Sequence, residues 1–384
     1  GFNLVGTNIV FSSAPTNGHA FFGIIYATAD YLNAGGTFPD GSTGSPSITF
    51  SNDTDTGIYR RGSGDIGFVS NSTEIVNIDG NGLTVTSKDA TINSITVGKG
   101  ANSVATNTVL GISALDAAVT GTHNTAVGQL TLTDNTFGTG NTGIGSSALN
   151  NNTSGNYNTG VGYGAMAANT TAHHNVAVGF VALDVNTSGA NNVAIGSSAL
   201  GANTTASNNT AVGYNSLLSN TTGSPNTAVG ANALQSNTTG NLNTALGKGA
   251  LQSATTASTN TGIGHAALLS VVTGESNTAV GSSTLVNNTA SNNTAVGRDA
   301  LNANTTGANN VAVGSHTLDV STTGNKNTAI GRAALSANTT AHDNTAVGAD
   351  ALLVNTTGTE NTAVGANALD ANTTASDNTA IGYN

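Results

Sequence analysis

The sequence predicts an all-β chain whose larger part is a β-solenoid, a fold in which short repeated turns stack along one axis. Three observations lead to this prediction. A seventeen-residue unit that begins with Asn recurs from residue 107 to residue 378, and its fifth residue is always Gly. Such a fixed short period is typical of stacked architectures. Only 7% of the residues are charged, yet Val, Ile and Leu keep fixed places in every unit, which indicates an ordered chain and not a disordered one.

The repeat runs almost without interruption. Every step is seventeen residues except the one from 277 to 293, which lacks one residue of an Asn-Thr-Thr corner. The chain therefore holds seventeen copies, the last cut short. Their opening Asn residues stand at positions 107, 124, 141, 158, 175, 192, 209, 226, 243, 260, 277, 293, 310, 327, 344, 361 and 378.

Positions two to four of each unit predict a short strand. Position two is Thr or Val and position four is Val, Ile or Leu, residue types that favour strands. Position three is Ala or Gly, except for Val109 in the first copy. Because side chains alternate across a strand, we expect positions two and four to form a core face and position three to pack closely against something. That neighbour is either another chain or the interior of the same chain.

The remainder of the unit predicts a turn that cannot fold alone. The invariant Gly at position five indicates a positive φ angle or a close backbone approach. Position nine is Leu, or Met166 in one copy, and an Asn/Thr corner follows. Two or three buried apolar side chains contribute about 1.5–3 kcal/mol each, whereas ordering the backbone costs roughly 1–2 kcal/mol per residue. Stacked at about 4.8 Å per strand, the turns would form a rod roughly 80 Å long.

The residues before the repeat predict a different β architecture. They read as alternating strands separated by Asp-Gly and Asn-Gly turns, which is typical of hairpins. We divide the chain into a β-rich connector over 1–40, an interwoven β-strand module over 41–93 and the solenoid over 94–384, with Ser94–Asn102 as a shortened first turn. Because the chain starts at Gly1 and stops just inside a repeat, we expect it to be part of a longer protein.

Composition excludes several classes of function. The net charge is -11 without any basic cluster, which argues against binding nucleic-acid phosphates. No apolar run has the roughly 18–20 residues of a membrane helix. The chain has no Cys, so disulfides and thiolate metal sites are excluded. We predict no cofactor and no membrane insertion.

The repeat resembles a known family. The hexads NNVAIG (191–196) and NNTAVG (208–213) are similar to the head-domain repeat of trimeric autotransporter adhesins of the YadA-like type, Asn-Ser-Val-Ala-Ile-Gly. The resemblance covers 94–384 and implies a left-handed parallel β-roll assembled as a parallel homotrimer, with the Ala/Gly position at or near the packing between chains. The family usually has fourteen-residue turns, so this chain departs by three residues per turn.

The first part of the chain resembles another group. The stretches GTNIVFSSAPTNGHAFFGIIY (6–26) and SPSITFSNDTDTGIYRRGSGDIGFVSNSTEIVNIDGNGLTV (45–85) are similar to β-rich segments of phage tail fibres, especially of the cyanophage type. This resemblance implies a fibre that attaches through its N-terminal part to the virion or to a preceding fibre protein.

No residue is predicted to be catalytic, to bind a cofactor or to bind a metal. Acidic residues fall at variable turn positions and are interpreted as solvated loop residues, not as catalytic pairs. The adjacent histidines occur in one turn only and lack the helical spacing of a metal site. The residues considered are Asp184, Asp299, Asp319, Asp350, His173 and His174.

Other features have two interpretations. Aromatic residues after the invariant Gly, namely Tyr163, Phe180, Tyr214 and Tyr383, either stack on sugars or mark a tolerant position, and the second interpretation is favoured. The Asn-Thr-Thr triplets match glycosylation sequons, but their period favours a turn. Their adjacent threonines do not form the flat Thr-x-Thr array of ice-binding solenoids. The pair Arg60-Arg61 is interpreted as a turn or an interchain salt-bridge site.

The sequence therefore predicts a non-enzymatic fibrous protein. The preferred hypothesis is a phage tail fibre in the virion, whose homotrimeric shaft contacts other tail proteins and projects a distal element toward a host receptor. The alternative is a bacterial surface adhesin of the trimeric autotransporter type. A polysaccharide-degrading tailspike and an ice-binding solenoid are less favoured.

Overall fold

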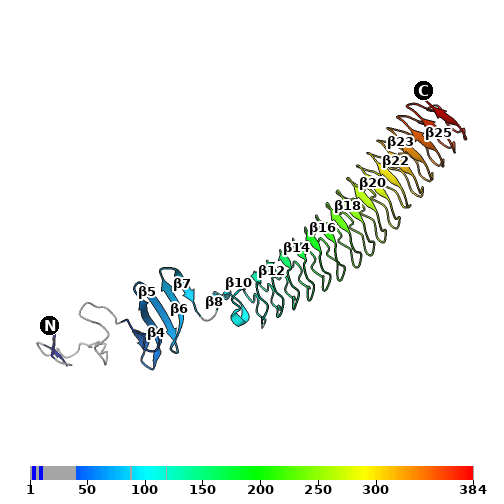
Figure 1. Cartoon of the computed structure of the whole chain (residues 1–384). Helices are drawn as coiled ribbons and strands as arrows, with labels where there is room; N and C mark the ends of the chain where they lie inside the picture. Colours follow the sequence, from blue (N-terminus) through cyan, green and yellow to red (C-terminus); the bar gives the residue numbers. More distant parts are fainter. Residues whose placement is uncertain (1, 6–7, 12–39, 87–88, 118, 384) are drawn as a thin grey trace, which may run out of the picture. The chain divides into compact units, whose positions relative to one another are not determined.

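The computed structural model describes all residues except 1, 6–7, 12–39, 87–88, 118 and 384. The chain divides into two compact units, Gly1–Lys88 and Asp89–Asn384, which are described separately. Across the described residues the structure is all-β apart from one short 3-10 helix, η1 (Ala101–Ser103). The predicted all-β class and the repeat solenoid of seventeen-residue turns are confirmed (Figure 1).

The first unit consists of antiparallel sheets. Strands β1 (Phe2–Val5) and β2 (Asn8–Phe11) form a hairpin, and most of the predicted connector over 1–40 lies outside the described residues. A five-stranded sheet comes next, and its strands lie side by side in the order of the sequence. Its strands are β3 (Ile48–Phe50), β4 (Asp53–Gly62), β5 (Asp65–Ser70), β6 (Thr73–Asp79) and β7 (Gly82–Val85).

The sheet of the first unit is a meander with a predicted turn. Asp79 pairs with Gly82, so β6 and β7 are joined by the two residues Gly80 and Asn81, as the Asp-Gly-Asn-Gly sequence predicts. Its buried residues include Tyr59 and Val69. One chain forms all five strands of this sheet.

The second unit is a parallel ladder with one strand per turn. Each strand pairs in parallel with the strand of the next turn, and each position faces the same position, as Thr227 faces Thr244. The strands are β10 (Thr108–Gly111), β11 (Thr125–Val127), β12 (Thr142–Ile144), β13 (Thr159–Val161), β14 (Val176–Val178), β15 (Val193–Ile195), β16 (Thr210–Val212), β17 (Thr227–Val229), β18 (Thr244–Leu246), β19 (Thr261–Ile263), β20 (Thr278–Val280), β21 (Thr294–Val296), β22 (Val311–Val313), β23 (Thr328–Ile330), β24 (Thr345–Val347), β25 (Thr362–Val364) and β26 (Thr379–Ile381).

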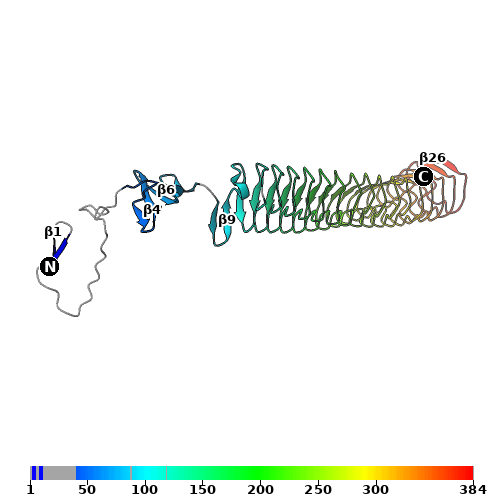
Figure 2. The ribbon, with the colours of Figure 1, turned by 90° about the horizontal axis from the view of Figure 1, so that it is seen from below.

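The start of the ladder corrects one prediction. Ser94–Asn102 does not form a shortened parallel turn. Strands β8 (Ala90–Ile92) and β9 (Ile95–Gly98) form an antiparallel hairpin, and β9 also pairs antiparallel with β10. Figure 2 shows β9 beside the first turn. The hairpin covers the free edge of β10, which would otherwise be open to pairing with another strand.

The faces of the strand are the reverse of the predicted ones. The residue at position three is buried in every solenoid strand from β10 to β25 and half-buried in β26, whereas positions two and four are partly or fully exposed. The residue at position three packs against other residues of its own chain. A Cβ added to Gly160 would lie 3.2 Å from the Leu149 side chain and 3.2 Å from the Ala165 carbonyl oxygen. Position three is small because residues of its own turn and of the preceding turn are near.

The solenoid core contains a leucine column. Leu at position nine, or Met166, is fully buried in turn after turn, and Ala at positions three and eight packs against it. The invariant Gly fulfils both parts of its prediction. Gly196 has a φ of +132°, and a Cβ there would lie 2.5 Å from the Gly213 carbonyl oxygen. Side chains are therefore excluded at this corner by conformation and by space.

Two ladders of buried Asn side chains run through the core, one at position one and one at position twelve, where only a turn-forming corner was predicted. At position one, the Asn243 N–H donates to Asn226 Oδ1 at 3.0 Å, and Asn226 Nδ2 donates to the Gly240 carbonyl at 2.8 Å. At position twelve, Asn237 Nδ2 donates to Asn220 Oδ1 at 2.7 Å. These bonds satisfy backbone groups that would otherwise be buried without partners.

The second ladder has a defect that predicts a stabilising substitution. Ser321 replaces Asn at position twelve, and the buried Asn304 Oδ1 in the preceding turn has no hydrogen-bond partner. Ser321→Asn would donate to Asn304 Oδ1 and accept from Asn338 Nδ2, whose present bond to the Ser321 hydroxyl is long, at 3.5 Å. We expect stabilisation by about 0.5–1.5 kcal/mol in urea unfolding. Ser321→Ala should destabilise, and equal effects of both substitutions would contradict the ladder account.

Candidate functional site

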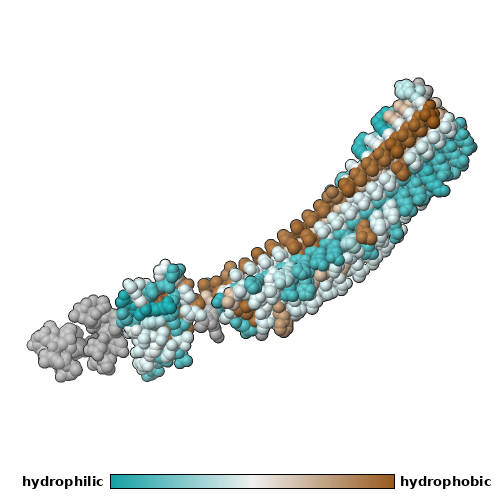
Figure 3. Space-filling model, viewed as in Figure 1, coloured by the Kyte–Doolittle hydropathy of each residue, from teal (hydrophilic) through white to brown (hydrophobic). Residues whose placement is uncertain are grey.

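The most extensive surface feature of the second unit is an apolar stripe on the outward face of its sheet. We define the apolar stripe as the Val, Ile and Leu residues at position four from Val127 to Val364. These side chains are half-buried or exposed, with Leu246 at 47% exposure. Figure 3 shows the stripe as a continuous brown band along the solenoid, bordered by paler small and polar residues. Contiguous exposed apolar bands of this length are rare on monomeric proteins.

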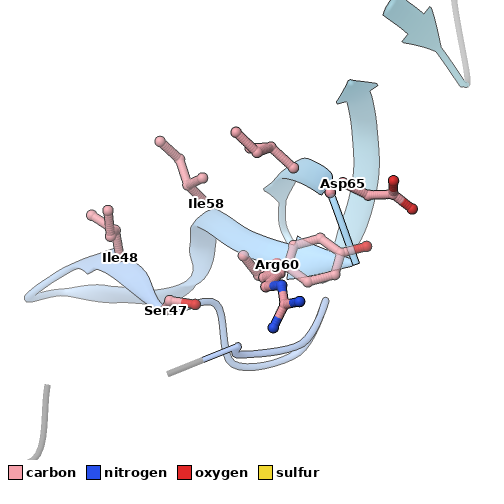
Figure 4. A pocket seen from close by; sticks show the side chains of 8 residues that line it. Ser47, Ile48, Ile58, Arg60 and Asp65 are labelled. Atoms are coloured by element: carbon pink, nitrogen blue, oxygen red, sulfur yellow. The ribbon is translucent and has the colours of Figure 1, made fainter. Parts of the chain in front are cut away.

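The sheet of the first unit also carries an exposed apolar face. The register places Ile58 opposite Ile48 on one side and opposite Phe68 on the other. Exposed side chains of this unit include Ile48, Phe50, Ile66, Ile78 and Leu83. Figure 4 shows Ile48 and Ile58 on the same side of the sheet, within a shallow depression that Arg60 and Asp65 also line.

Arg60 and Arg61 lie on strand β4 and have partners in their own chain. Arg60 contacts Asp40 at 3.1 Å and Arg61 contacts Glu74 at 3.2 Å. Neither a turn position nor an interchain bridge is needed to explain the pair. Burial, followed by the hydrogen bond to Glu74, raises the pKa of the Tyr59 hydroxyl.

The aromatic residues at position six are exposed, as both sequence interpretations require. Tyr163, Phe180 and Tyr214 have between 57% and 59% of their surface accessible, and Tyr383 has 77%. The rings of Tyr163 and Phe180, one turn apart, are stacked with centroids 5.6 Å apart and planes 13° apart. These residues therefore form part of a surface column along the solenoid.

The two histidines belong to a second surface column. The His174 ring stacks on Tyr157 at 5.3 Å, and His173 Nδ1 accepts the Asn156 N–H at 2.9 Å. A search of the described residues finds no group of three His, Cys, Asp or Glu side chains arranged for a metal ion. The pair is thus held by stacking and a backbone hydrogen bond.

Two of the acidic residues meet around a histidine that sequence reasoning missed. His316 Nδ1 lies 3.6 Å from Asp319 and 3.8 Å from Asp299, and Nε2 lies 2.7 Å from the Arg298 guanidinium. Burial raises the pKa of Asp319, and the His316 charge acts against that shift. The only available signal was that positions six, seven and ten of neighbouring units hold charged residues.

The remaining acidic residues are separate from this cluster. Asp350 forms an ion pair with Arg332 from the preceding turn. No ion pair involves Asp184 in the part of the chain that the structure describes, and burial raises the pKa of its carboxyl. Asp184 lines a depression on the solenoid surface together with Ser198, Gly201 and Leu218.

The Asn residues of the Asn-Thr-Thr triplets lie inside the solenoid, except for the half-buried Asn372 in the last one. Asn169, which begins an Asn-Thr-Thr triplet, is fully buried, and its Nδ2 donates to Asn152 Oδ1 at 2.7 Å. A glycan cannot be attached to such a side chain in the folded turn. The structural interpretation of the triplet is therefore preferred, with a buried ladder added to the turn.

Comparisons with protein-family models, with curated proteins and with solved structures found no match to this chain. Among the described residues, no helix is long and apolar enough to cross a membrane. The function is therefore inferred from the surfaces of the chain itself.

Proposed function

We propose that this chain is a structural protein that associates with copies of itself through the apolar stripe and serves as the stiff shaft of a fibre. The observation that carries the proposal is the stripe, which repeats at the same position in turn after turn on the outward face. Water contact along such a band is unfavourable by roughly 25 cal/mol for each Å² of apolar surface, so covering it favours association.

Stiffness follows from the ladder. Successive turns are joined by parallel strand pairing, by Asn ladders and by a continuous column of leucine side chains. Bending would separate these contacts on one side of the rod. Sixteen steps of about 4.8 Å give a shaft roughly 80 Å long.

The proposed assembly is a parallel homotrimer of left-handed β-rolls. Its support is the resemblance of the NNVAIG and NNTAVG hexads to trimeric adhesin heads, together with the two exposed apolar surfaces. In this arrangement the stripe of each chain faces the common axis. The small residues at position three lie inside their own chain, and not between chains as the resemblance implied.

Charges on the stripe are expected to block association. Leu246→Glu with Ile263→Glu places two carboxylates on adjacent turns of the stripe, and burying unpaired charges there is strongly unfavourable. We expect light scattering to show single chains for this variant. The matched control is Thr239→Glu with Thr256→Glu, at exposed corner positions of adjacent turns. If both variants keep the wild-type mass, the stripe is not the interface.

The biological role we propose is that of a phage tail fibre exposed on the virion. The N-terminal modules would join other tail proteins, and the shaft would hold a receptor-binding element away from the particle. The support is the resemblance of the stretches 6–26 and 45–85 to such fibres. Immunogold microscopy of the source culture with antibody to the repeat tests this role. Label on virus tails is expected, and label on bacterial envelopes without particles would favour the adhesin alternative.

A further inference from the structure

We propose that the apolar face of the five-stranded sheet in the first unit packs against the same face of further copies of this chain, and that this contact fixes the axial register of the fibre. The inference rests on the proposed self-association through the apolar stripe. It deepens that function, because it assigns the alignment of the copies to a separate surface. The partner is a second copy of the chain in the same orientation.

Eight apolar side chains from all five strands lie on one face of this sheet, which we call the sheet face. Residues directly opposite each other in an antiparallel pair share a face, and so do residues two apart on one strand, such as Ile66 and Phe68. Five of the eight are exposed, Leu83 by 69%. The two rows of the sheet face are Ile48, Ile58, Phe68, Val76 and Val85, and, beside Arg60, Ile66, Ile78 and Leu83.

The opposite face of the sheet is covered by its own side chains. Tyr59 lies over Gly67, where an added Cβ would be 2.3 Å from the Tyr59 ring, and the Tyr59 hydroxyl donates to the Glu74 carboxylate. Tyr59 is 7% exposed, and Asn77, which is paired with Gly67, is 4% exposed. Within the described part of the chain, the sheet face has no comparable cover.

The area of the sheet face indicates which partner it can hold. Five strands spaced by about 4.8 Å, each about four residues long, cover roughly 300 Å². A stable pair of separate proteins needs about 800 Å² per partner. An occupant of the sheet face must therefore be kept close by another contact. Copies joined through the apolar stripe meet this condition, because their first units are then at a high effective concentration.

The sheet face carries no charge that would select a different kind of partner. Arg60 is the one charged residue in its two rows, and its guanidinium lies 3.1 Å from the Asp40 carboxylate of the same chain. Each copy therefore brings its own counter-charge, and two copies can meet without an unpaired cation between them.

The apolar stripe alone cannot fix the register of the copies. It has fifteen positions from Val127 to Val364, each occupied by Val, Ile or Leu and each one turn after the last. A shift of one copy by one turn still pairs fourteen of the fifteen, with Val229 where Val212 was. Registers that differ so little in their contacts compete with one another.

The sheet face removes this equivalence because it occurs once in each chain. Copies whose sheet faces pack together are aligned in one register only. Shifted copies leave part of the stripe unpaired at each end, and such ends bind further chains without closing the assembly. The sheet face therefore limits growth to a closed assembly of aligned chains.

Charges on the sheet face test this role. Ile66 and Ile78 lie opposite each other on adjacent strands and are 46% and 43% exposed, so glutamates there should leave the fold intact. The wild-type assembly should show a single mass in light scattering. We expect Ile66→Glu with Ile78→Glu to give a broad distribution that extends to about twice that mass or more. The control Ser63→Glu with Asn81→Glu adds the same charge at exposed turns of the same sheet and should keep the wild-type mass.

This inference and the proposed function fail in different ways. A uniform wild-type mass for the Ile66→Glu, Ile78→Glu variant, or the mass of a single chain, would overturn the role of the sheet face. A single-chain mass for the wild type itself would instead contradict self-association through the stripe.

Disulfides between engineered cysteines measure the register directly, because the chain has no cysteine of its own. Chains with Val229→Cys are unfolded and refolded together with chains with Ile263→Cys, and these positions are two turns, or about 10 Å, apart along the axis. A disulfide needs Cα atoms about 4.4–6.8 Å apart, so a mixed disulfide forms only between shifted copies. We expect mixed disulfides in the Ile66→Glu, Ile78→Glu background and not in the wild-type background. Mixed disulfides in both backgrounds, or in neither, would overturn the proposal.

Discussion

Asn226→Asp is expected to destabilise the solenoid by about 3–5 kcal/mol at neutral pH, because it places an unpaired charge in the core. Asn226 is 2% exposed. Its Nδ2 donates to the Gly240 carbonyl at 2.8 Å, and its own N–H donates to Asn209 Oδ1 at 2.9 Å. A carboxylate would still accept from the Asn243 N–H, but its other oxygen would face the Gly240 carbonyl. Urea unfolding followed by circular dichroism measures the loss.

The destabilisation by Asn226→Asp should depend on pH in a defined direction. Burial beside carbonyl oxygens disfavours the charged form, so the pKa of the new carboxyl is raised in the folded chain above about 3.9, the unfolded value. The folded state then binds more protons, and stability falls as pH rises through the interval from the unfolded pKa to the folded pKa. Acidification should therefore restore part of the lost stability.

A neighbouring asparagine supplies the control. Asn241 is exposed, and its Oδ1 accepts the Ser224 N–H at 2.7 Å, a bond that Asp would keep. We expect Asn241→Asp to change stability by only about 0.5 kcal/mol. If Asn226→Asp is equally mild and independent of pH, the buried ladder does not exist as described.

Leu234→Ala is expected to cost about 2–5 kcal/mol, because it leaves a cavity in the leucine column. Leu234 is fully buried between the equivalent residues of adjacent turns, Leu217 and Leu251. In a stacked repeat the contacts of one turn support its two neighbours, so the loss should extend to them. Hydrogen exchange should show faster opening of the strands on both sides of the substituted turn.

Two further substitutions test whether the loss of stability depends on the burial of the leucine side chain. Leu234→Met should cost less than about 1.5 kcal/mol, as the natural Met166 suggests. Leu242→Ala removes an exposed leucine and should change stability by about 0.5 kcal/mol or less. A similar loss from Leu242→Ala and Leu234→Ala would contradict the assignment of the core.

The sequence predicted correctly those features for which a residue type has a single structural explanation. The invariant Gly at position five and the Leu at position nine are confirmed in conformation and burial. The faces of the strand were predicted in reverse, because β-branched residues favour strands on either face. Position three was correctly recognised as tightly packed. Its neighbours belong to the same chain, as Gly160 shows with Ala165 of its own turn and Leu149 of the preceding turn.

The features that were missed depend on contacts between turns. Asn has a strong preference for turns, so its invariance at position one was not recognised as a buried ladder. The cluster around His316 depends on which turns carry Arg298 and Asp319, a placement that requires the register of the stacked turns. The depression at Gly201 likewise requires residues from three neighbouring turns, such as Asp184 and Leu218. By contrast, the exposure of Phe180 and Tyr214 follows from their variable position.

The molar mass of the chain in solution, measured by light scattering, tests the central claim most directly. The apolar stripe leads us to expect self-association, and the resemblance of the repeat to trimeric adhesin heads leads us to expect three chains, with three times the 37.5 kDa mass of one chain. The Leu246→Glu, Ile263→Glu variant should have the mass of a single chain under the same conditions. A wild-type mass of one chain, at all concentrations measured, would contradict self-association through the stripe and with it the proposed fibre shaft.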